Sequence, residues 1–554
     1  AAALVTPAAA DLTWDPANST WAVDEPFASG GTGFRQGDDV TFGPLNGADG
    51  TVTLQGALEV GKMIVDAESG DVYTFSGSAE NSITSLTDLT IMGGTAGFSS
   101  SQVLPEGAKV DVYGGGKMKL NTGDDLCNCN LNLTLGGAGN GAAVLELEGS
   151  NSMTVLGGSL TMKDGSILRL SNTAYYPWCE MKGDLTVEGT VTVDMAAGMA
   201  ALNISGSYQG DGTIRITGES TWSMISLRAP GRYNLILDCI DAEVSLNENT
   251  YANIVIPEGR AGGVSFAGGR ASADVRADGD FYMYAVSNDV IIKSLSGSGT
   301  ALASQGTLIL EDGDFSGPMQ VGETWQFSDA TLVLGSPDAM SEAESVDLAG
   351  GASCVASLAL ADGVESATLK NLTGTEYSRL QAGSYRVTVG SVEDGDCFAG
   401  TLDDGVTLTL GSGSVMNLNG ARAADAAAAS IVGEGGSTIR NLTLGTGLTL
   451  GASLSAGDAP VILDQVTLAD GGTIRLASVG SSEEASSLLS FTASGNMASS
   501  LSAGESVLLA LGDDVLSSLV TDQDYVLISD LGTGVDADCF RLNYADAGSS
   551  QFKL

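Results

Sequence analysis

The stretch Val466-Thr467-Leu468-Ala469-Asp470-Gly471-Gly472-Thr473-Ile474-Arg475-Leu476 decides the fold. Apolar and polar residues alternate on both sides of Asp470-Gly471, which is the period-two pattern of half-buried strands. The Asp-Gly pair predicts a tight turn, because glycine tolerates a positive φ and aspartate can hydrogen-bond its own backbone. The stretch therefore predicts a strand, a turn and a second strand.

The same unit recurs along the chain. Leu160–Leu170 matches it position for position, Asp211–Ile216 repeats its second half, and Leu402–Leu410 is a looser copy. A reused strand-turn unit predicts a solenoid, in which each coil packs on its neighbours. Gly-Gly steps and the lack of long helical segments favour parallel strands. At ~25 residues per coil we expect an all-β parallel β-helix of about 20 coils.

Composition supports a folded repeat protein and excludes two classes of partner. Hydrophobic residues make up 43% of the 554 residues, which is too many for a disordered chain. Lys and Arg number 23 against 68 Asp and Glu, a net charge of −45. Because nucleic acids and anionic membranes attract basic surfaces, neither is an expected partner. The acidic surface is interpreted as a source of solubility, with calcium loading as the alternative.

Histidine and cysteine usage narrows the chemistry further. The chain has no His, so His-based triads and His-ligated zinc are excluded. Its seven Cys include no C-x-x-C pair. A bridge from Cys127 or Cys129 to Cys179, and another between Cys354 and Cys397, are two hypotheses. The alternative is that these cysteines are small buried residues of interior ladders.

Residues 1–45 are expected to form an N-terminal segment that caps the solenoid. Trp14, Trp21, Phe34 and Phe42 concentrate aromatic side chains there. The first coil has no coil beneath it, so its open core needs such a cover.

This N-terminal pattern resembles bacterial proteins with autotransporter-associated β-strand repeats. The resemblance is carried, up to about Thr95, by the two tryptophans and by Gly37–Phe42, Val52–Leu54, Leu58–Val65 and Tyr73–Gly77. It implies a right-handed parallel β-helix that is exported and displayed on, or released from, the outer membrane. Further along, only Leu-Thr-Leu-Gly and Asp-Gly-Thr-Ile units match.

The two ends of the chain fit the same picture. The Ala-rich start resembles the region left after a signal peptide is cut. The last 70 residues are expected to form final coils rather than a barrel.

Residues 46–554 are expected to form one continuous β-helix. Short excursions from the β pattern are predicted near 335–345, 421–430 and 511–520. A division of the chain near 335–345 is the alternative.

The charged residues predict structure more strongly than catalysis. Arg169, Arg215 and Arg475 follow Asp-Gly turns at equivalent points, which favours surface ladders with nearby carboxylates. Glu311-Asp312-Gly313-Asp314 and Glu393-Asp394-Gly395-Asp396 carry ligands that calcium prefers, but neither continues into a calcium-loop pattern. We therefore predict no catalytic residue, no metal and no cofactor, with calcium as the alternative.

One aromatic group stands out as a candidate contact site. Tyr175, Tyr176 and Trp178 flank a proline, which disfavours a central strand and favours a loop or an edge. Such rings can stack on sugars or anchor a protein partner. The alternative is a loop that folds over its own aromatics.

Together these features predict a non-enzymatic β-helical protein, exported to the bacterial cell surface or released. It would serve as an adhesin or as a structural or assembly rod. Its partner would be a glycan or protein on another surface, or a second copy of the chain. The chain itself is expected to have no helix that spans a membrane. The alternatives are a polysaccharide lyase or hydrolase on the same scaffold, and a subunit of a homomeric fibre or surface layer.

Overall fold

The protein is an all-β parallel β-helix of about 17 turns, with 58% of its residues in strands. This confirms the predicted fold class. The turns are fewer than the expected 20, and among the described strands their lengths vary from 18 residues between Val290 and Leu308 to 37 between Phe491 and Ile528. The computed structural model describes residues 10–121, 127–148, 153–171, 178–196, 199–219, 222–266, 271–284, 289–323, 328–390, 397–455, 458–476, 491–511, 528–529, 531 and 535–542.

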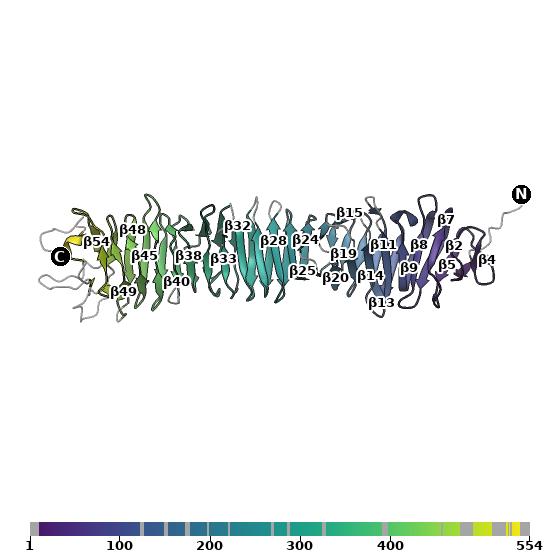
Figure 1. The fold of residues 1–554 in the computed structure, drawn as a ribbon, viewed down its shortest axis with the longest axis horizontal. Coiled ribbons are helices and arrows are strands. Elements are labelled where there is room, and N and C mark those ends of the chain that lie inside the picture. The colour runs from purple at the N-terminus through teal and green to yellow at the C-terminus, as the bar shows by residue number, and fades with distance from the viewer. Residues whose placement is uncertain are drawn as a thin grey trace. The chain divides into compact units, whose positions relative to one another are not determined.

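The chain divides into two compact units, Ala1–Ala273 (unit 1) and Asp274–Leu554 (unit 2). In each unit the strands are short arrows that lie side by side in successive turns (Figure 1).

Unit 1 is built from three parallel ladders and a small hairpin. The first ladder contains β1 (Asp11–Thr13), β5 (Asp39–Phe42), β7 (Ala57–Asp66), β9 (Ser82–Phe98), β10 (Lys109–Gly114), β13 (Asn132–Gly139), β16 (Leu160–Met162), β19 (Leu185–Val187) and β22 (Tyr208–Gln209). The second contains β2 (Thr20–Trp21), β6 (Thr51–Leu54), β8 (Val72–Ser76), part of β9, β11 (Gly116–Asn121), β14 (Val144–Glu148), β17 (Ile167–Leu170), β20 (Thr190–Asp194), β23 (Thr213–Gly218), β25 (Gly231–Cys239) and β27 (Thr250–Ile256). The third contains β12 (Cys127–Cys129), β15 (Met153–Leu156), β18 (Trp178–Met181), β21 (Met199–Ile204), β24 (Trp222–Leu227), β26 (Asp241–Leu246) and β28 (Ala261–Phe266). The hairpin pairs β3 (Pro26–Ala28) with β4 (Thr32–Gly33), and a 3-10 turn, η1, spans Ser101–Val103.

Unit 2 continues the same construction with further parallel ladders. One contains β29 (Ser272–Ala277), β31 (Val290–Ser296), β32 (Ala301–Leu310), β34 (Ala330–Leu334), β36 (Ala356–Leu360), β39 (Ser378–Leu380), β41 (Thr401–Leu402) and β44 (Arg422–Ala423). The next contains β30 (Asp280–Tyr284), part of β32, β33 (Met319–Val321), β35 (Val346–Leu348) and β38 (Leu372–Gly374). The longest of the remainder contains β37 (Ser366–Leu369), β40 (Arg386–Val389), β42 (Thr407–Leu410), β45 (Ala429–Glu434), β48 (Leu448–Ser453), β51 (Thr473–Leu476), β54 (Val507–Leu511) and β56 (Phe540–Leu542). Two shorter ladders contain β43 (Val415–Asn417), β46 (Thr438–Arg440), β49 (Val461–Asp464), β52 (Phe491–Ala493) and β55 (Ile528–Ser529), and β47 (Thr443–Leu444), β50 (Thr467–Leu468) and β53 (Ala498–Ser499); a 3-10 turn, η2, spans Ala537–Cys539.

The core consists of inward side chains that stack from turn to turn. Parallel register places one such column across β14, β17, β20, β23 and β25, namely Leu145, Leu168, Val193, Ile216 and Leu237. Each of these side chains is at most 2% exposed. Because side chains alternate between the two faces of a strand, the residues next to each core residue on its own strand point outward. These outward residues form the surface ladders.

The Asp-Gly units form corners between ladders. In the Leu160–Leu170 copy, β16 and β17 flank Gly165, whose φ is 74°, and Gly471 in the Val466–Leu476 unit has the same φ. The two strands of a unit do not form a hairpin: β16 pairs with β13 and β19, while β17 pairs with β14 and β20. A positive φ is needed for this corner, and glycine adopts it without a steric penalty.

The aromatic residues expected to form the cap are buried together at the start of unit 1. Trp14, Trp21, Phe34 and Phe42 are each at most 3% exposed. Trp21 packs edge-on against Phe34 with ring centroids 5.4 Å apart, and Phe27 contacts both tryptophans. The packing continues from Phe42 into the rings of Phe75 and Phe98.

The three predicted excursions have different outcomes. Residues 335–345 form turns between β34 and β35, and Ala339, Met340 and Ala343 are buried there. Residues 421–430 contain β44 and the start of β45, which pair in parallel ladders, while residues 424–428 between them leave the β pattern as a turn. In the third, Leu511 ends β54 and residues 512–520 lie outside the described residues.

Candidate functional site

A charge ladder runs across the outer face of the second ladder in unit 1. Lys119, Glu146, Arg169 and Asp194 are direct register partners on β11, β14, β17 and β20. The Arg169 Nε lies 2.8 Å from Asp194 Oδ2, and the Lys119 Nζ lies 3.7 Å from Glu146 Oε2. Lys117 contacts the same Glu146 oxygen. The alternating signs thus place opposite charges in register on four consecutive turns, with ion pairs between the first two turns and between the last two.

Neighbouring cations lower the pKa values of two ladder carboxylates, Glu146 and Asp238. Burial alone would raise the pKa of Glu146, but hydrogen bonds from Lys117 and Ser171 and the charges of both lysines outweigh it and lower the pKa. Burial likewise opposes, but does not overcome, the effect of Arg215 and Arg260, which together lower the pKa of Asp238. A carboxylate with a lowered pKa is a good hydrogen-bond acceptor and a poor general acid.

The predicted arginine ladders are confirmed for two of the three residues. Arg169 pairs with Asp194, and Arg215 pairs with Asp238, each on the following turn. Arg475 differs, because its register neighbours on β48 and β54 are Gly451 and Ala510. An arginine four residues after the Gly of Asp-Gly, as at Arg169 and Arg475, or three residues after it, as at Arg215, therefore does not determine which residue lies opposite on the next turn.

The aromatic contact candidate lies partly outside the described residues, where Tyr175 and Tyr176 fall. Trp178 is described, and it is the first residue of β18 rather than part of a loop or an edge. It stands in register between Met153 and Ala201, and its side chain is 37% exposed. The proline precedes the strand in sequence, so it removes no ladder hydrogen bond within β18.

Trp178 belongs to an apolar row that crosses four strands. Met153, Trp178, Ala201 and Met224 follow one another in register on β15, β18, β21 and β24, and we call them the Trp178 row. The other three members are partly exposed. Sequence reasoning singled out Trp178 but missed its neighbours, because they become adjacent only through the pairing of turns.

A second row crosses β18, β21, β24 and β26, and on the first three of these strands it lies two residues beyond the Trp178 row. Glu180, Asn203, Ser226 and Ser245 are in register and form the polar row. They alternate with core residues such as Met181 and Leu202, so they belong to the outer face, yet all are at most 9% exposed. The Ser205 hydroxyl donates to Glu180 Oε1 at 3.0 Å, while the Asn203 Oδ1 has no hydrogen-bond partner among the described residues.

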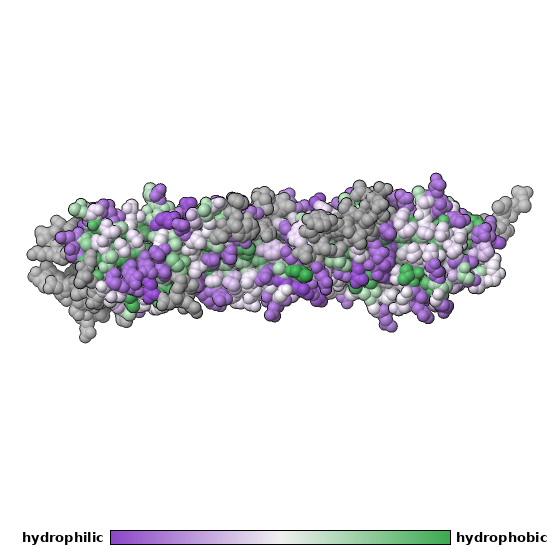
Figure 2. Space-filling view, in the orientation of Figure 1, coloured by the Kyte–Doolittle hydropathy of each residue, from purple (hydrophilic) through white to green (hydrophobic). Residues whose placement is uncertain are grey.

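Exposed large apolar side chains elsewhere are isolated. On the face shown in Figure 2, apolar patches are small and separated by hydrophilic residues. Ile462 is as exposed as Trp178, at 37%, but its register neighbours are Thr438 and Thr492. Single exposed apolar residues are ordinary features of protein surfaces. The Trp178 row differs because its apolar members are contiguous and include an exposed tryptophan. A second contiguous row in unit 2 is aliphatic throughout, namely Ile291, Ile309, Val333 and Ala359.

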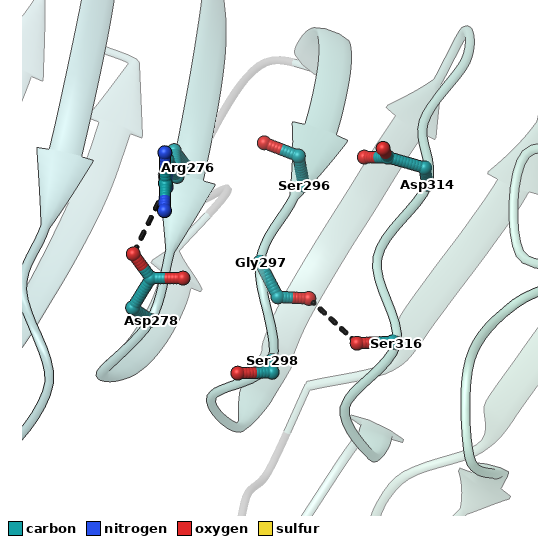
Figure 3. A pocket seen from close by; sticks show the side chains of 7 residues that line it. All are labelled: Arg276, Asp278, Ser296, Gly297, Ser298, Asp314 and Ser316. Atoms are coloured by element: carbon teal, nitrogen blue, oxygen red, sulfur yellow. Dashed lines mark hydrogen bonds and ion pairs between the residues drawn. The ribbon is translucent and has the colours of Figure 1, made fainter.

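Unit 2 contains a shallow polar hollow of about 350 Å³. Figure 3 shows Arg276 and Asp278 on one side of it, Ser296, Gly297 and Ser298 in the middle, and Asp314 and Ser316 on the other side. Arg276 Nε donates to Asp278 Oδ2 at 2.9 Å, and the Ser316 hydroxyl donates to the Gly297 carbonyl at 3.2 Å. The lining offers a guanidinium, carboxylates and hydroxyls, and no aromatic ring.

Among the described residues, no three Cys, Asp or Glu side chains lie close enough together to bind a metal ion. In the first calcium candidate, Glu311 pairs with Lys293 at 2.8 Å, and Asp312 accepts a hydrogen bond from the Gly313 amide. Asp314 lines the hollow instead. The second candidate, residues 393–396, lies outside the described residues.

Neither hypothetical disulfide forms, because Cys179, Cys354 and Cys397 all carry free thiols. Cys179 stacks in the core in register with Thr154 and Leu202. Its burial, together with the nearby Cys129 and Glu180, raises its pKa to about 12. The alternative, small buried residues of interior ladders, describes Cys179; Cys354 is also buried, but it lies outside the ladders in an isolated bridge with Gly351.

Within the described ranges, no helix is long and apolar enough to cross a membrane. Comparisons of the chain with protein-family models, with curated proteins and with solved structures found no match.

Proposed function

We propose that this protein is a non-enzymatic, exported β-helical scaffold of the bacterial cell surface, displayed or released, that acts in adhesion or assembly. The resemblance of its first residues, up to about Thr95, to autotransporter-associated repeat proteins supports the exported location. The stacked ladders support the scaffold role, because they fix surface side chains in rows along successive turns.

The charged surface supports structure rather than turnover. Glu146 and Asp238 are held between cations that lower their pKa values. Glycoside hydrolysis needs one carboxylic acid with a raised pKa to protonate the leaving group. These ladder carboxylates instead bridge consecutive turns, as Arg169 and Asp194 do.

The Trp178 row is the observation that carries the binding role. Trp178 is a large side chain on a strand, so it contacts a partner without first losing loop entropy. Met153 lies next to it in the row, Met224 follows beyond Ala201 on the other side, and methionine adapts its shape to apolar partners. Tryptophan anchors dominate many protein interfaces. We therefore propose that the row binds a protein on another surface.

A binding comparison tests this proposal. Wild-type protein and the variants Trp178→Ala and Ile462→Ala are applied to immobilised extracellular-matrix proteins, to cell-surface protein extracts and to a glycan array. Ile462→Ala is the matched control, because its side chain has the same exposure but lies outside the row. We expect Trp178→Ala to weaken protein binding at least about tenfold, the range of an interface anchor, and Ile462→Ala to leave it unchanged.

Three results would contradict the proposal. Equal binding by wild type and Trp178→Ala would remove the row from the contact. Binding to glycans alone would assign a different class of partner. Release of sugar fragments from any polysaccharide would replace the scaffold with an enzyme.

A further inference from the structure

We propose that the hollow in unit 2 is a binding site for a single neutral saccharide residue, held by polar side chains rather than by stacking. The site consists of Arg276, Asp278, Ser296, Ser298 and Asp314, with Ser316 at its rim. It lies in a different unit from the Trp178 row, and it does not depend on the role proposed for that row.

The hollow arises from the order of side-chain sizes on three successive turns. The middle turn contributes only Ser296, Gly297 and Ser298, while Arg276 and Asp314 extend from the turns on either side (Figure 3). Leu295 and Gly313 are bridge partners, which brings Ser296 and Asp314 side by side. The volume of about 350 Å³ is at the small end of the range for ligand sites, which suits one sugar ring.

Asp314 is a carboxylate of this surface that has no ion pair or side-chain hydrogen bond with another described residue. Neighbouring carboxylates are all engaged: Asp278 by Arg276 at 2.9 Å, Asp280 by the Thr300 hydroxyl at 2.6 Å, and Glu311 by Lys293 at 2.8 Å. Among the described residues, no side chain donates to Asp314, and it faces the hollow (Figure 3). An ionised carboxylate can accept hydrogen bonds from two adjacent hydroxyl groups.

The opposite wall supplies donors. Arg276 uses Nε for Asp278, and its two terminal nitrogens have no partner among the described residues. Guanidinium nitrogens donate to ring and hydroxyl oxygens of a ligand. Ser296 and Ser298 add hydroxyls that both donate and accept. The hollow therefore has hydrogen-bond acceptors on the Asp314 side and donors on the Arg276 side. The hydroxyl groups of a polyol can donate to the first and accept from the second.

Charge and lining restrict the ligand further. The one arginine is already balanced by Asp278, so Asp314 leaves the hollow with a net negative charge inside a chain of net charge −45. An anionic ligand is repelled by that field. The lining has no apolar or aromatic side chain to receive an apolar ligand. A neutral ring with adjacent hydroxyl groups meets both conditions.

The test measures binding of defined monosaccharides to the full chain. Methyl glycosides of glucose, galactose, mannose and N-acetylglucosamine are titrated by saturation-transfer NMR, with sialic acid as the anionic probe and spermidine as the cationic probe. We expect at least one neutral glycoside to bind, and Asp314→Asn to weaken it about tenfold, the value of a lost charge-assisted hydrogen bond. Ser298→Leu, which fills the hollow and removes no charge, should abolish binding.

Asp312→Asn is the matched control, because this neighbouring carboxylate does not line the hollow. It should bind as wild type does, and thermal unfolding of all variants should coincide. Three results would overturn the proposal: no neutral glycoside binds, only spermidine or sialic acid binds, or Asp314→Asn and Ser298→Leu bind like wild type. If Trp178→Ala abolished sugar binding and Asp314→Asn did not, the sugar site would be in unit 1 and the proposal would be wrong.

Discussion

Arg169 and Asp194 stand directly opposite each other on consecutive turns of the β-helix, with Nε and Oδ2 2.8 Å apart. The pair joins β17 to β20 and ends a ladder that begins at Lys119 on β11. Both side chains are partly exposed, so one such pair contributes about 1 kcal/mol or less. Its role is to favour the correct register between turns, because a one-residue slip would separate the charges.

The buried member of this ladder should make stability depend on pH. The pKa of Glu146 is lower in the folded chain than in the unfolded chain, so its stabilising effect is fully present above the unfolded value. That effect is lost as pH falls through the folded pKa. We expect Glu146→Gln to lower the free energy of unfolding by about 1–3 kcal/mol at pH 7. The difference from wild type should vanish at the acidic end of a urea-unfolding series, and a difference that grew toward low pH would contradict this account.

The corner turns should be sensitive to a single added methyl group. Gly165 has a φ of 74°, and a Cβ there would meet no atom within 4 Å, so the only cost of alanine is backbone strain. We expect Gly165→Ala to destabilise by about 1–2 kcal/mol. Gly43 is the control, because it also has open space but no positive φ. Equal melting temperatures for the two alanine variants would show that the corner does not need glycine.

The stacked core column should respond strongly to truncation. Leu168 is 1% exposed and lies between Leu145 and Val193 in the column. We expect Leu168→Ala to lower the free energy of unfolding by about 2–5 kcal/mol. The cavity left by the smaller side chain cannot collapse, because the neighbouring turns on both sides hold the strand in place. Hydrogen exchange should show the loss first in β14, β17 and β20, because each turn contacts its neighbours. Uniform loss of protection across unit 1 would argue against this local coupling.

Thiol reactivity should separate the buried cysteines from the accessible ones. Burial raises the pKa of Cys179 to about 12, so its reactive thiolate is scarce at neutral pH. Cys397 is partly exposed. Under native conditions iodoacetamide should modify Cys397 and leave Cys179 unmodified, as read by peptide mass spectrometry. Denaturant should expose both, and native labelling of Cys179 would place it outside the core.

The sequence predicts this fold well because its signals are local. The Asp-Gly corners at 164–165 and 470–471 lie between strands of alternating polarity, and that pattern determines both the coil and its core face. The clustered aromatics at Trp14 and Trp21 likewise indicate burial, which the structure shows.

The candidate sites are less predictable because they depend on register. Trp178 meets Met153 and Ala201 only after turns of 25 and 23 residues are aligned. The hollow near Asp314 depends on turns of 20 and 18 residues, which break the expected period of the repeat. Small residues such as Ser296 form a hollow only when larger side chains lie beside them on adjacent turns, and the sequence does not show which residues are adjacent.

The central claim is that the Trp178 row is the surface through which this scaffold binds a protein partner. Hydroxyl-radical footprinting tests it directly, because radicals oxidise exposed Trp and Met side chains. With partner bound, oxidation of Trp178, Met153 and Met224 should fall severalfold while that of the exposed Met92 stays constant. Unchanged oxidation of Trp178, with protection at another surface of the chain, would contradict the claim.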